Sequence, residues 1–181
     1  DQGTEPLAVQ GPFFGAAAVP VLVAALGLAG QWIRRFGIAP LLRDGVSVSL
    51  LAALGGLVLT FVALGRNAGI GGGDAQAVDQ FLAGHGLMIL GLLASAGSVA
   101  VSVLTTRGPG MTMRRVPLFA WSSLIGALGM IIALPVAFAA IIYLFIDLRL
   151  GAAANFGGAE GIGAWLGWIF SVPAVAVFAL P

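Results

Sequence analysis

Five long apolar runs dominate the sequence, and they constrain its fold more than any other feature. Each is close to the roughly 20 mostly apolar residues that an α-helix needs to cross the hydrocarbon core of a bilayer. Inside hydrocarbon every backbone amide must be paired within its segment, and the runs lack the alternation of a membrane β-barrel. The sequence therefore predicts an all-α, polytopic membrane helix bundle, with residues 1–181 forming a single domain. The expected spans are residues 13–30, 46–65, 81–104, 117–146 and 162–180.

The composition supports a membrane protein and excludes several kinds of site. Hydrophobic residues make up 60% of the 181 residues and charged residues only 8%, whereas soluble domains carry about 25% charged residues. All 8 basic residues are arginines in short loops, so we expect no nucleic-acid partner. The chain has no Cys and 1 His. Disulfides, thiolate metal sites and a multi-histidine metal centre are therefore excluded within this chain.

The distribution of the arginines predicts the orientation of the bundle. Loops 31–45 and 105–116 hold six of the 8 arginines, and the N-terminal tail carries acidic residues but no base. Cytoplasmic loops of membrane proteins are enriched in Lys and Arg. We therefore expect loops 31–45 and 105–116 in the cytoplasm and the N-terminus outside, in a bacterial-type inner membrane.

Small residues recur in the second and third spans, where they would let helix backbones approach closely. We expect close helix packing at these positions. The stretch GIGGG at 69–73 lacks the strand and helix of a phosphate-binding loop, so we expect no nucleotide site. Pro135 is expected to bend or kink the fourth span. The candidate packing positions are Ala53, Gly55 and Gly56 in the second span, and Gly91, Ala94, Gly97 and Ser98 in the third.

His85, near the start of the third span, is the clearest candidate for chemistry inside the membrane. Its imidazole could ligate haem or another metal, carry protons or hydrogen-bond a neighbouring helix, and the sequence favours the last of these roles. Asp147 and Arg149 could pair where the fourth span ends, although residues two apart do not face each other on a helix. Met111 and Met113 lie beside arginines in a loop and are expected to contact the lipid surface.

The stretch from 105 to 151 carries a resemblance to a known family. It begins TTRGPGMTMRRVPLFAW and closely resembles subunit I of cytochrome c oxidase, in the haem-copper oxidase superfamily, whose pattern reads close to NMRAPGMTMHKVPLFAW. By order, the resemblance implies that the five spans correspond to the family's helices two to six, and that this loop is cytoplasmic. The matching residues are Arg107, Pro109, Gly110, Met111, Thr112, Met113, Pro117, Leu118, Phe119, Trp121, Leu134, Pro135, Val136, Asp147 and Arg149.

The family's reactive positions fall on apolar residues in this chain. Its C-terminal stretch WIFSVPAVAVFALP is similar to the family's WFFGHPEVYIIVLP. The resemblance implies that the copper-ligating His falls on Val172, the proton-delivering Glu on Ala174 and the cross-linked Tyr on Ala176. Val and Ala offer no lone pair to copper and no proton to transfer. By order, the resemblance implies that the haem-ligating His of the family's second helix falls near Val9 and that His85 lies in the fourth helix, whose His is not a metal ligand. The stretch GHGLM at 84–88 nevertheless closely resembles the family's haem-ligating pattern, which reads like GHGILMMFFVVIPAL.

Three functional hypotheses follow from these observations. In the first, the chain is a non-catalytic subunit with a structural or accessory role in a respiratory or other energy-transducing complex, and its partners are other integral membrane subunits. In the second, it is part of an active terminal oxidase that passes electrons to oxygen and pumps protons. In the third, it is a scaffold that holds lipid, quinone or pigment between Gly-rich spans. We expect the first, with no cofactor bound by this chain; haem could be held only through His85 or other chains.

Overall fold

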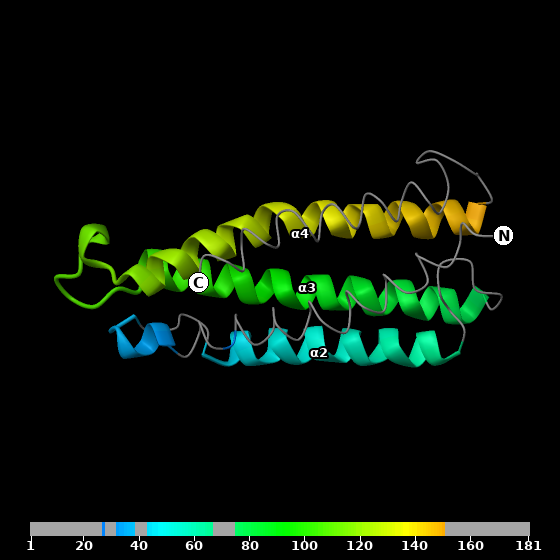
Figure 1. The fold of residues 1–181 in the computed structure, drawn as a ribbon, viewed down its shortest axis with the longest axis horizontal. Coiled ribbons are helices and arrows are strands. Elements are labelled where there is room, and N and C mark those ends of the chain that lie inside the picture. The colour runs from blue at the N-terminus through cyan, green and yellow to red at the C-terminus, as the bar shows by residue number, and fades with distance from the viewer. Residues whose placement is uncertain (1–26, 28–31, 39–42, 67–74, 151–181) are drawn as a thin grey trace, which may run out of the picture.

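Three long helices make up most of the computed structural model, which describes residues 27, 32–38, 43–66 and 75–150. They are α2 (Arg43–Gly65), α3 (Ala75–Thr105) and α4 (Leu118–Leu150), and a short 3₁₀ helix, η1 (Met113–Arg115), precedes α4. Helix α3 lies in the middle and packs against both of the others (Figure 1). Within the described part, α2 and α4 do not contact each other. Successive helices run in opposite directions, as expected of a chain that crosses a membrane repeatedly.

The helices confirm the second, third and fourth predicted spans. The segments long and apolar enough to cross a membrane are Ser47–Gly65, Gln76–Thr105 and Leu118–Tyr143. Helix α3 extends beyond the predicted 81–104 at both ends, and α4 extends beyond the predicted end at 146, because helical hydrogen bonding continues into the polar residues that flank an apolar run. Helix α4 also continues through Pro135. The predicted spans 13–30, apart from Gly27, and 162–180 lie outside the described residues, so five spans remain a prediction.

Helices α2 and α3 approach each other so closely that only glycine fits at three positions. A Cβ added to Gly56 would lie 2.5 Å from a backbone oxygen of α3, and one added to Gly91 would lie 2.5 Å from backbone atoms of α2. One added to Gly84 would lie 2.7 Å from the hydroxyl of Thr60. The backbones of the two helices therefore touch directly, as small residues allow in a membrane bundle. No room for a lipid, quinone or pigment is left between them at these positions.

Buried hydroxyl groups complete this contact. The Oγ atoms of Ser49 and Ser95 lie 2.7 Å apart and join α2 to α3 by a hydrogen bond. Ser95 also donates to the carbonyl oxygen of Gly91, 3.0 Å away. A hydroxyl that bonds its own helix and the neighbouring one carries no unpaired polar group into the membrane, where such a group would be costly.

The predicted packing positions are partly right. Ala53, Gly56 and Gly91 lie in the contact between α2 and α3. Gly55 and Gly97 lie outside this contact, since no atom of the described part lies within 4 Å of a Cβ built on either glycine. Ala94 also lies outside it, because its side chain is exposed. Small residues occupy both faces of each helix, so composition alone does not show which face packs.

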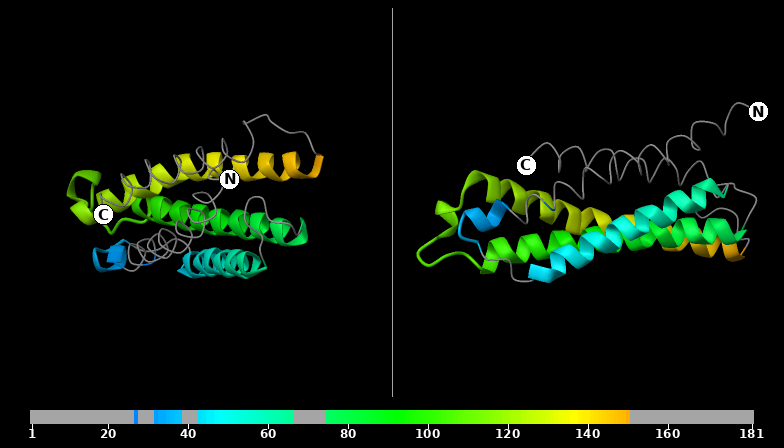
Figure 2. Two further views of the ribbon diagram at one scale, coloured as in Figure 1. Left: turned by 45° about the vertical axis from the view of Figure 1, so that its right-hand side comes forward. Right: turned by 90° about the horizontal axis from the view of Figure 1, so that it is seen from below.

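Burial is concentrated along α3, while the outer faces of the bundle are apolar and exposed. Ile89, Leu92 and Val99 of α3 are almost completely buried. Large apolar side chains such as Val58 of α2 and Ile132 of α4 are exposed. The view from below in Figure 2 shows α2 crossing α3 obliquely. An exposed apolar surface on helices of spanning length is the surface that lipid chains cover.

Candidate functional site

His85 lies in the contact between α2 and α3, about three turns from the start of α3. Its Nδ1 atom is 3.2 Å from the carbonyl oxygen of Phe81 and 3.3 Å from the Oγ1 atom of Thr60 on α2. Thr60 is buried, and its hydroxyl donates to the carbonyl oxygen of Gly56, 2.9 Å away. The ring of Phe81 lies 4.4 Å from the imidazole, centroid to centroid. The structure thus places His85 as a link between the two helices.

These contacts determine which ring nitrogen of His85 carries the proton. The carbonyl oxygen of Phe81 can only accept a hydrogen bond, and the single hydroxyl hydrogen of Thr60 is already donated to Gly56. Nδ1 must therefore be protonated and donate to both oxygens. In the neutral ring Nε2 then keeps its lone pair, and it has no hydrogen-bond partner among the described residues.

A polar cluster lies at the same end of the bundle as His85. Arg149 of α4 forms an ion pair with Asp79 of α3. Arg66, which follows α2, donates a hydrogen bond of 3.2 Å to Gln80 of α3. The sequence left open a pairing of Arg149 with Asp147, and the structure instead places the guanidinium of Arg149 against Asp79 on α3. Because α3 begins where α4 ends, antiparallel packing brings the two charges together.

The loop between α3 and α4 contributes two methionine side chains to the packing. Met111 and Met113 are half-buried and pack against the core, and their contact with the lipid surface stays a prediction. The Sδ atom of Met113 accepts a hydrogen bond of 2.8 Å from Arg107, which also donates to the carbonyl oxygen of Val103. The indole of Trp121 donates to the carbonyl oxygen of Met113, 3.1 Å away. The contacts of Met113 hold the loop in place and engage its sulfur atom.

Comparison with known proteins identifies the family of the chain. A sequence profile described as cytochrome c and quinol oxidase polypeptide I matches residues 8–181. This chain is a member of the cytochrome c and quinol oxidase polypeptide I family. The resemblance carried by residues 105–151 is thereby confirmed.

Individual relatives in this oxidase family are much longer than the chain. Cytochrome c oxidase subunit 1 of Corynebacterium diphtheriae is 30% identical over 167 residues, covering 91% of this chain and 28% of the relative. Putative cytochrome c oxidase subunit 1-beta of Streptomyces avermitilis is 30% identical over 159 residues, covering 86% of this chain and 27% of the relative. Cytochrome c oxidase subunit 1 of Cereibacter sphaeroides is 38% identical over 98 residues, covering 49% and 17%. The chain spans a little more than a quarter of the first two, and no solved structure matches it.

The donor groups of this oxidase-family chain do not fit a copper centre. A copper site built on imidazoles needs more than one His, and the chain has 1 His and no Cys. Among the described residues, no group of three His, Cys, Asp or Glu side chains lies together. The free Nε2 of His85 could supply a single axial ligand to a haem iron. The positions to which the resemblance assigns reactive groups, Val172, Ala174 and Ala176, lie outside the described residues.

Proposed function

We propose that the chain is a non-catalytic, oxidase subunit I-like membrane subunit with a structural role in a respiratory or other energy-transducing complex. The observation that carries this proposal is the position of its only imidazole. His85 donates through Nδ1 to α3 and to α2, which is what a residue that pairs two membrane helices does. The apolar residues at the family's reactive positions, Val172, Ala174 and Ala176, support the same conclusion.

Two substitutions of His85 distinguish a role in pairing α2 with α3 from a role as a haem ligand. The amide nitrogen of Asn can stand where Nδ1 stands but leaves nothing in place of Nε2, so His85→Asn keeps the donor to Thr60. We expect this variant to retain wild-type stability and to leave the haem content and oxygen uptake of the complex unchanged. His85→Leu removes the donor and is expected to lower the free energy of unfolding by about 0.6 kcal/mol, and at most about 1.7 kcal/mol. Unfolding in mixed micelles and the reduced-minus-oxidised spectrum measure both effects.

A loss of haem absorbance in His85→Asn at unchanged stability would contradict the proposal. It would favour a second candidate, in which the chain is part of an active terminal oxidase. The relatives named cytochrome c oxidase subunit 1, of which this chain spans a little more than a quarter, support that candidate. The accessory role has its own check: the tagged chain should co-purify with further integral membrane subunits in mild detergent, and a chain that purifies alone would speak against it.

We also propose that the end of the bundle formed by the loop between α3 and α4 faces the cytoplasm of a bacterial-type membrane. The support is the excess of arginines in loops 31–45 and 105–116. Because the chain has no Cys, single cysteines report the orientation. Arg66→Cys should react with a membrane-impermeant maleimide on intact cells, and Thr112→Cys only after lysis. The reverse pattern of labelling would overturn the orientation.

A further inference from the structure

Arginines from two distant segments lie at the end of the bundle opposite the Asp79–Arg149 ion pair. Arg34 and Arg35 lie in a helical turn at 32–35, and Gly37, with φ +77, ends that turn. The N–H of Gly37 donates to the carbonyl oxygen of Arg34, 3.1 Å away, and the N–H of Ile38 to that of Ile33, 3.2 Å away. This pair of bonds is a Schellman motif, whose left-handed residue is usually Gly. The motif ends the helical turn directly after Arg34 and Arg35 and so fixes the backbone position of both residues.

The loop between α3 and α4 is held against this turn. Ile38 forms an antiparallel bridge with Arg107. A Cβ added to Gly108 would lie 3.2 Å from the carbonyl oxygen of Gly37, so the two segments approach closely. The loop continues into η1, which carries Arg114 and Arg115. We call the four residues Arg34, Arg35, Arg114 and Arg115 the arginine end.

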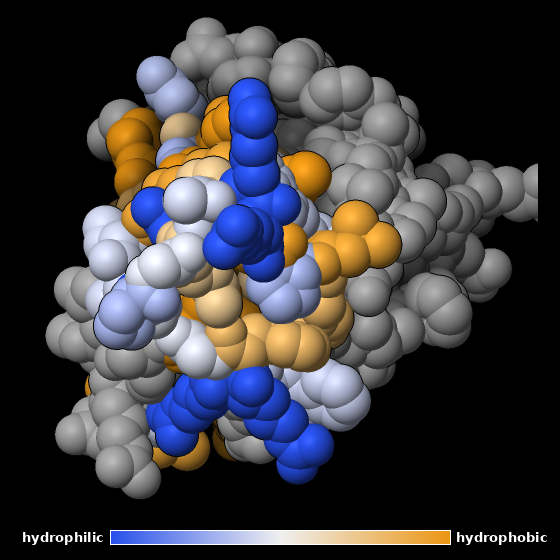
Figure 3. All heavy atoms as spheres, turned by 90° about the vertical axis from the view of Figure 1, so that its left-hand side faces the viewer, coloured by the Kyte–Doolittle hydropathy of each residue, from blue (hydrophilic) through white to orange (hydrophobic). Residues whose placement is uncertain are grey.

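The guanidinium groups of the arginine end are available to a ligand. All four side chains are exposed, and none has an ion-pair partner among the described residues. Arg107, by contrast, donates its hydrogen bonds inside the protein. Loops 31–45 and 105–116 contain six arginines and a single acidic residue, Asp44. Figure 3 looks onto this end and shows strongly hydrophilic side chains in more than one group, with residues of intermediate and apolar character between them.

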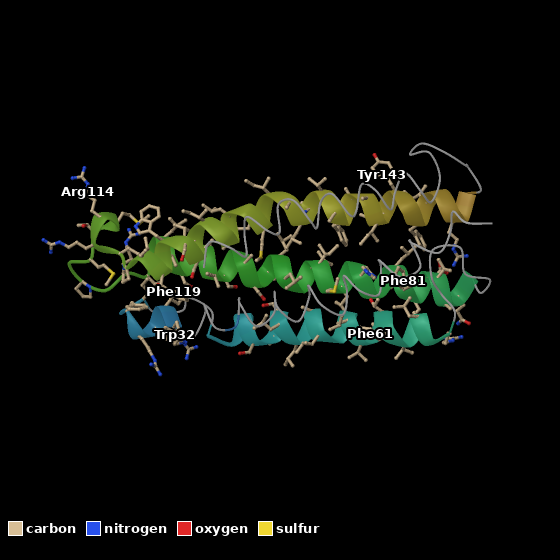
Figure 4. All side chains as sticks on the ribbon, viewed as in Figure 1. Trp32, Phe61, Phe81, Arg114, Phe119 and Tyr143 are labelled. Atoms are coloured by element: carbon tan, nitrogen blue, oxygen red, sulfur yellow. The ribbon has the colours of Figure 1, made fainter. Side chains whose placement is uncertain are left out.

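The depth of these arginines matches the headgroup layer of a bilayer. Arg114 and Arg115 lie between the candidate spans Gln76–Thr105 and Leu118–Tyr143. Trp32, which is 46% exposed, lies in the same helical turn as Arg34 and Arg35. Its ring is 5.9 Å from that of Phe119, and the guanidinium of Arg35 lies 5.4 Å from the centroid of the Trp32 ring. Figure 4 shows Trp32 beside Phe119, and Arg114 pointing away from the bundle. Exposed Trp rings gather at the membrane interface.

We propose that the arginine end binds the phosphate headgroups of anionic phospholipids, in preference to zwitterionic ones. Guanidinium groups bind phosphate oxygens through paired N–H donors, which makes Arg well suited to a phosphodiester. Clusters of four or more basic residues immediately outside a spanning helix attract anionic lipid, with each residue contributing about 1 kcal/mol. The uncompensated positive charge at this end favours phosphatidylglycerol over phosphatidylcholine, and the binding should weaken as salt screens it.

The test measures lipid retained by the 181-residue chain in mixed micelles of phosphatidylglycerol and phosphatidylcholine. We expect wild type to retain phosphatidylglycerol preferentially. Two double variants test the four arginines. One combines Arg34→Gln with Arg35→Gln, and the other combines Arg114→Gln with Arg115→Gln. Each double variant should weaken retention of phosphatidylglycerol roughly 25-fold, since each arginine near the surface contributes about fivefold. The matched control is Arg66→Gln with Arg149→Gln, which removes the same charge from the opposite end and should change retention less than threefold.

Lipid retention is compared only among variants whose circular dichroism and hydrodynamic radius match those of wild type, so that a folding defect is not mistaken for lost binding. Equal retention of the two lipids by wild type would overturn the proposal. So would an effect of the control pair as large as that of the arginine-end pairs. A preference for phosphatidylglycerol that survives loss of all four arginines would overturn it as well.

Discussion

Replacing Gly91 by Ala should separate α2 from α3. The new Cβ would lie 2.5 Å from backbone atoms of Ala53 and Ser49, and backbone cannot move aside as a flexible side chain can. Overpacking a tight contact typically costs about 1–3 kcal/mol, and we expect about 3 kcal/mol here because the neighbour is backbone. Gly56→Ala should behave in the same way, since its Cβ would lie 2.5 Å from backbone atoms of Gly84 and Met88.

The matched controls are Gly55→Ala and Gly97→Ala on the same two helices. No described atom lies within 4 Å of a Cβ at either position. Because Ala favours a helix interior over Gly by up to about 1 kcal/mol, these two variants should be neutral or slightly stabilised. Helix pairing can be measured directly by replacing Ser49 and Ser95, whose Oγ atoms are 2.7 Å apart, with cysteines in this Cys-free chain. Equal disulfide yields in Gly91→Ala and Gly97→Ala would contradict the helix contact described above.

Truncating Leu92 should produce the second largest loss of stability. Its side chain is completely buried on α3, the helix that packs against both neighbours. Leu→Ala substitutions in soluble cores cost about 2–5 kcal/mol. We expect about 2 kcal/mol, because lipid chains solvate an exposed Leu as well as the core does and only the lost packing counts. Unfolding in mixed micelles measures the difference.

Leu90 provides the control for this substitution, because it lies two residues away on the same helix but is 45% exposed. Leu90→Ala should change the free energy of unfolding by less than about 0.5 kcal/mol. If both substitutions cost the same, the exposed face of α3 would be covered by another part of the protein or by a partner.

The sequence predicted the helices better than it predicted their contacts. Length and apolarity are sufficient to find the spans that became α2, α3 and α4, because hydrocarbon permits few other structures. They do not distinguish Gly55, which faces no described atom, from Gly56, which touches the backbone of α3. That choice depends on how the two helices rotate about their axes, and small residues on both faces leave the rotation undetermined.

The sequence predicted the role of His85 but not its hydrogen-bond partner. The single His pointed to His85 as a hydrogen-bonding group, but its partner Thr60 follows only from the pairing of α2 with α3. The Asp79–Arg149 ion pair could have been found from the sequence. Antiparallel helices place the start of α3 beside the end of α4, so a carboxylate at one and a guanidinium at the other are natural partners. The prediction compared only residues close in sequence and therefore missed the pair.

The most direct test of the account is the metal and haem content of the purified chain, freed of other polypeptides. Elemental analysis counts copper atoms per chain, and the reduced-minus-oxidised spectrum counts haem. We predict neither copper nor haem in stoichiometric amount. A copper site needs more than one imidazole, and the chain has 1 His and no Cys. Haem would have to be held through Nε2 of His85 alone, whose Nδ1 pairs α2 with α3. One copper or one haem per chain, bound to its own side chains, would contradict the proposed function.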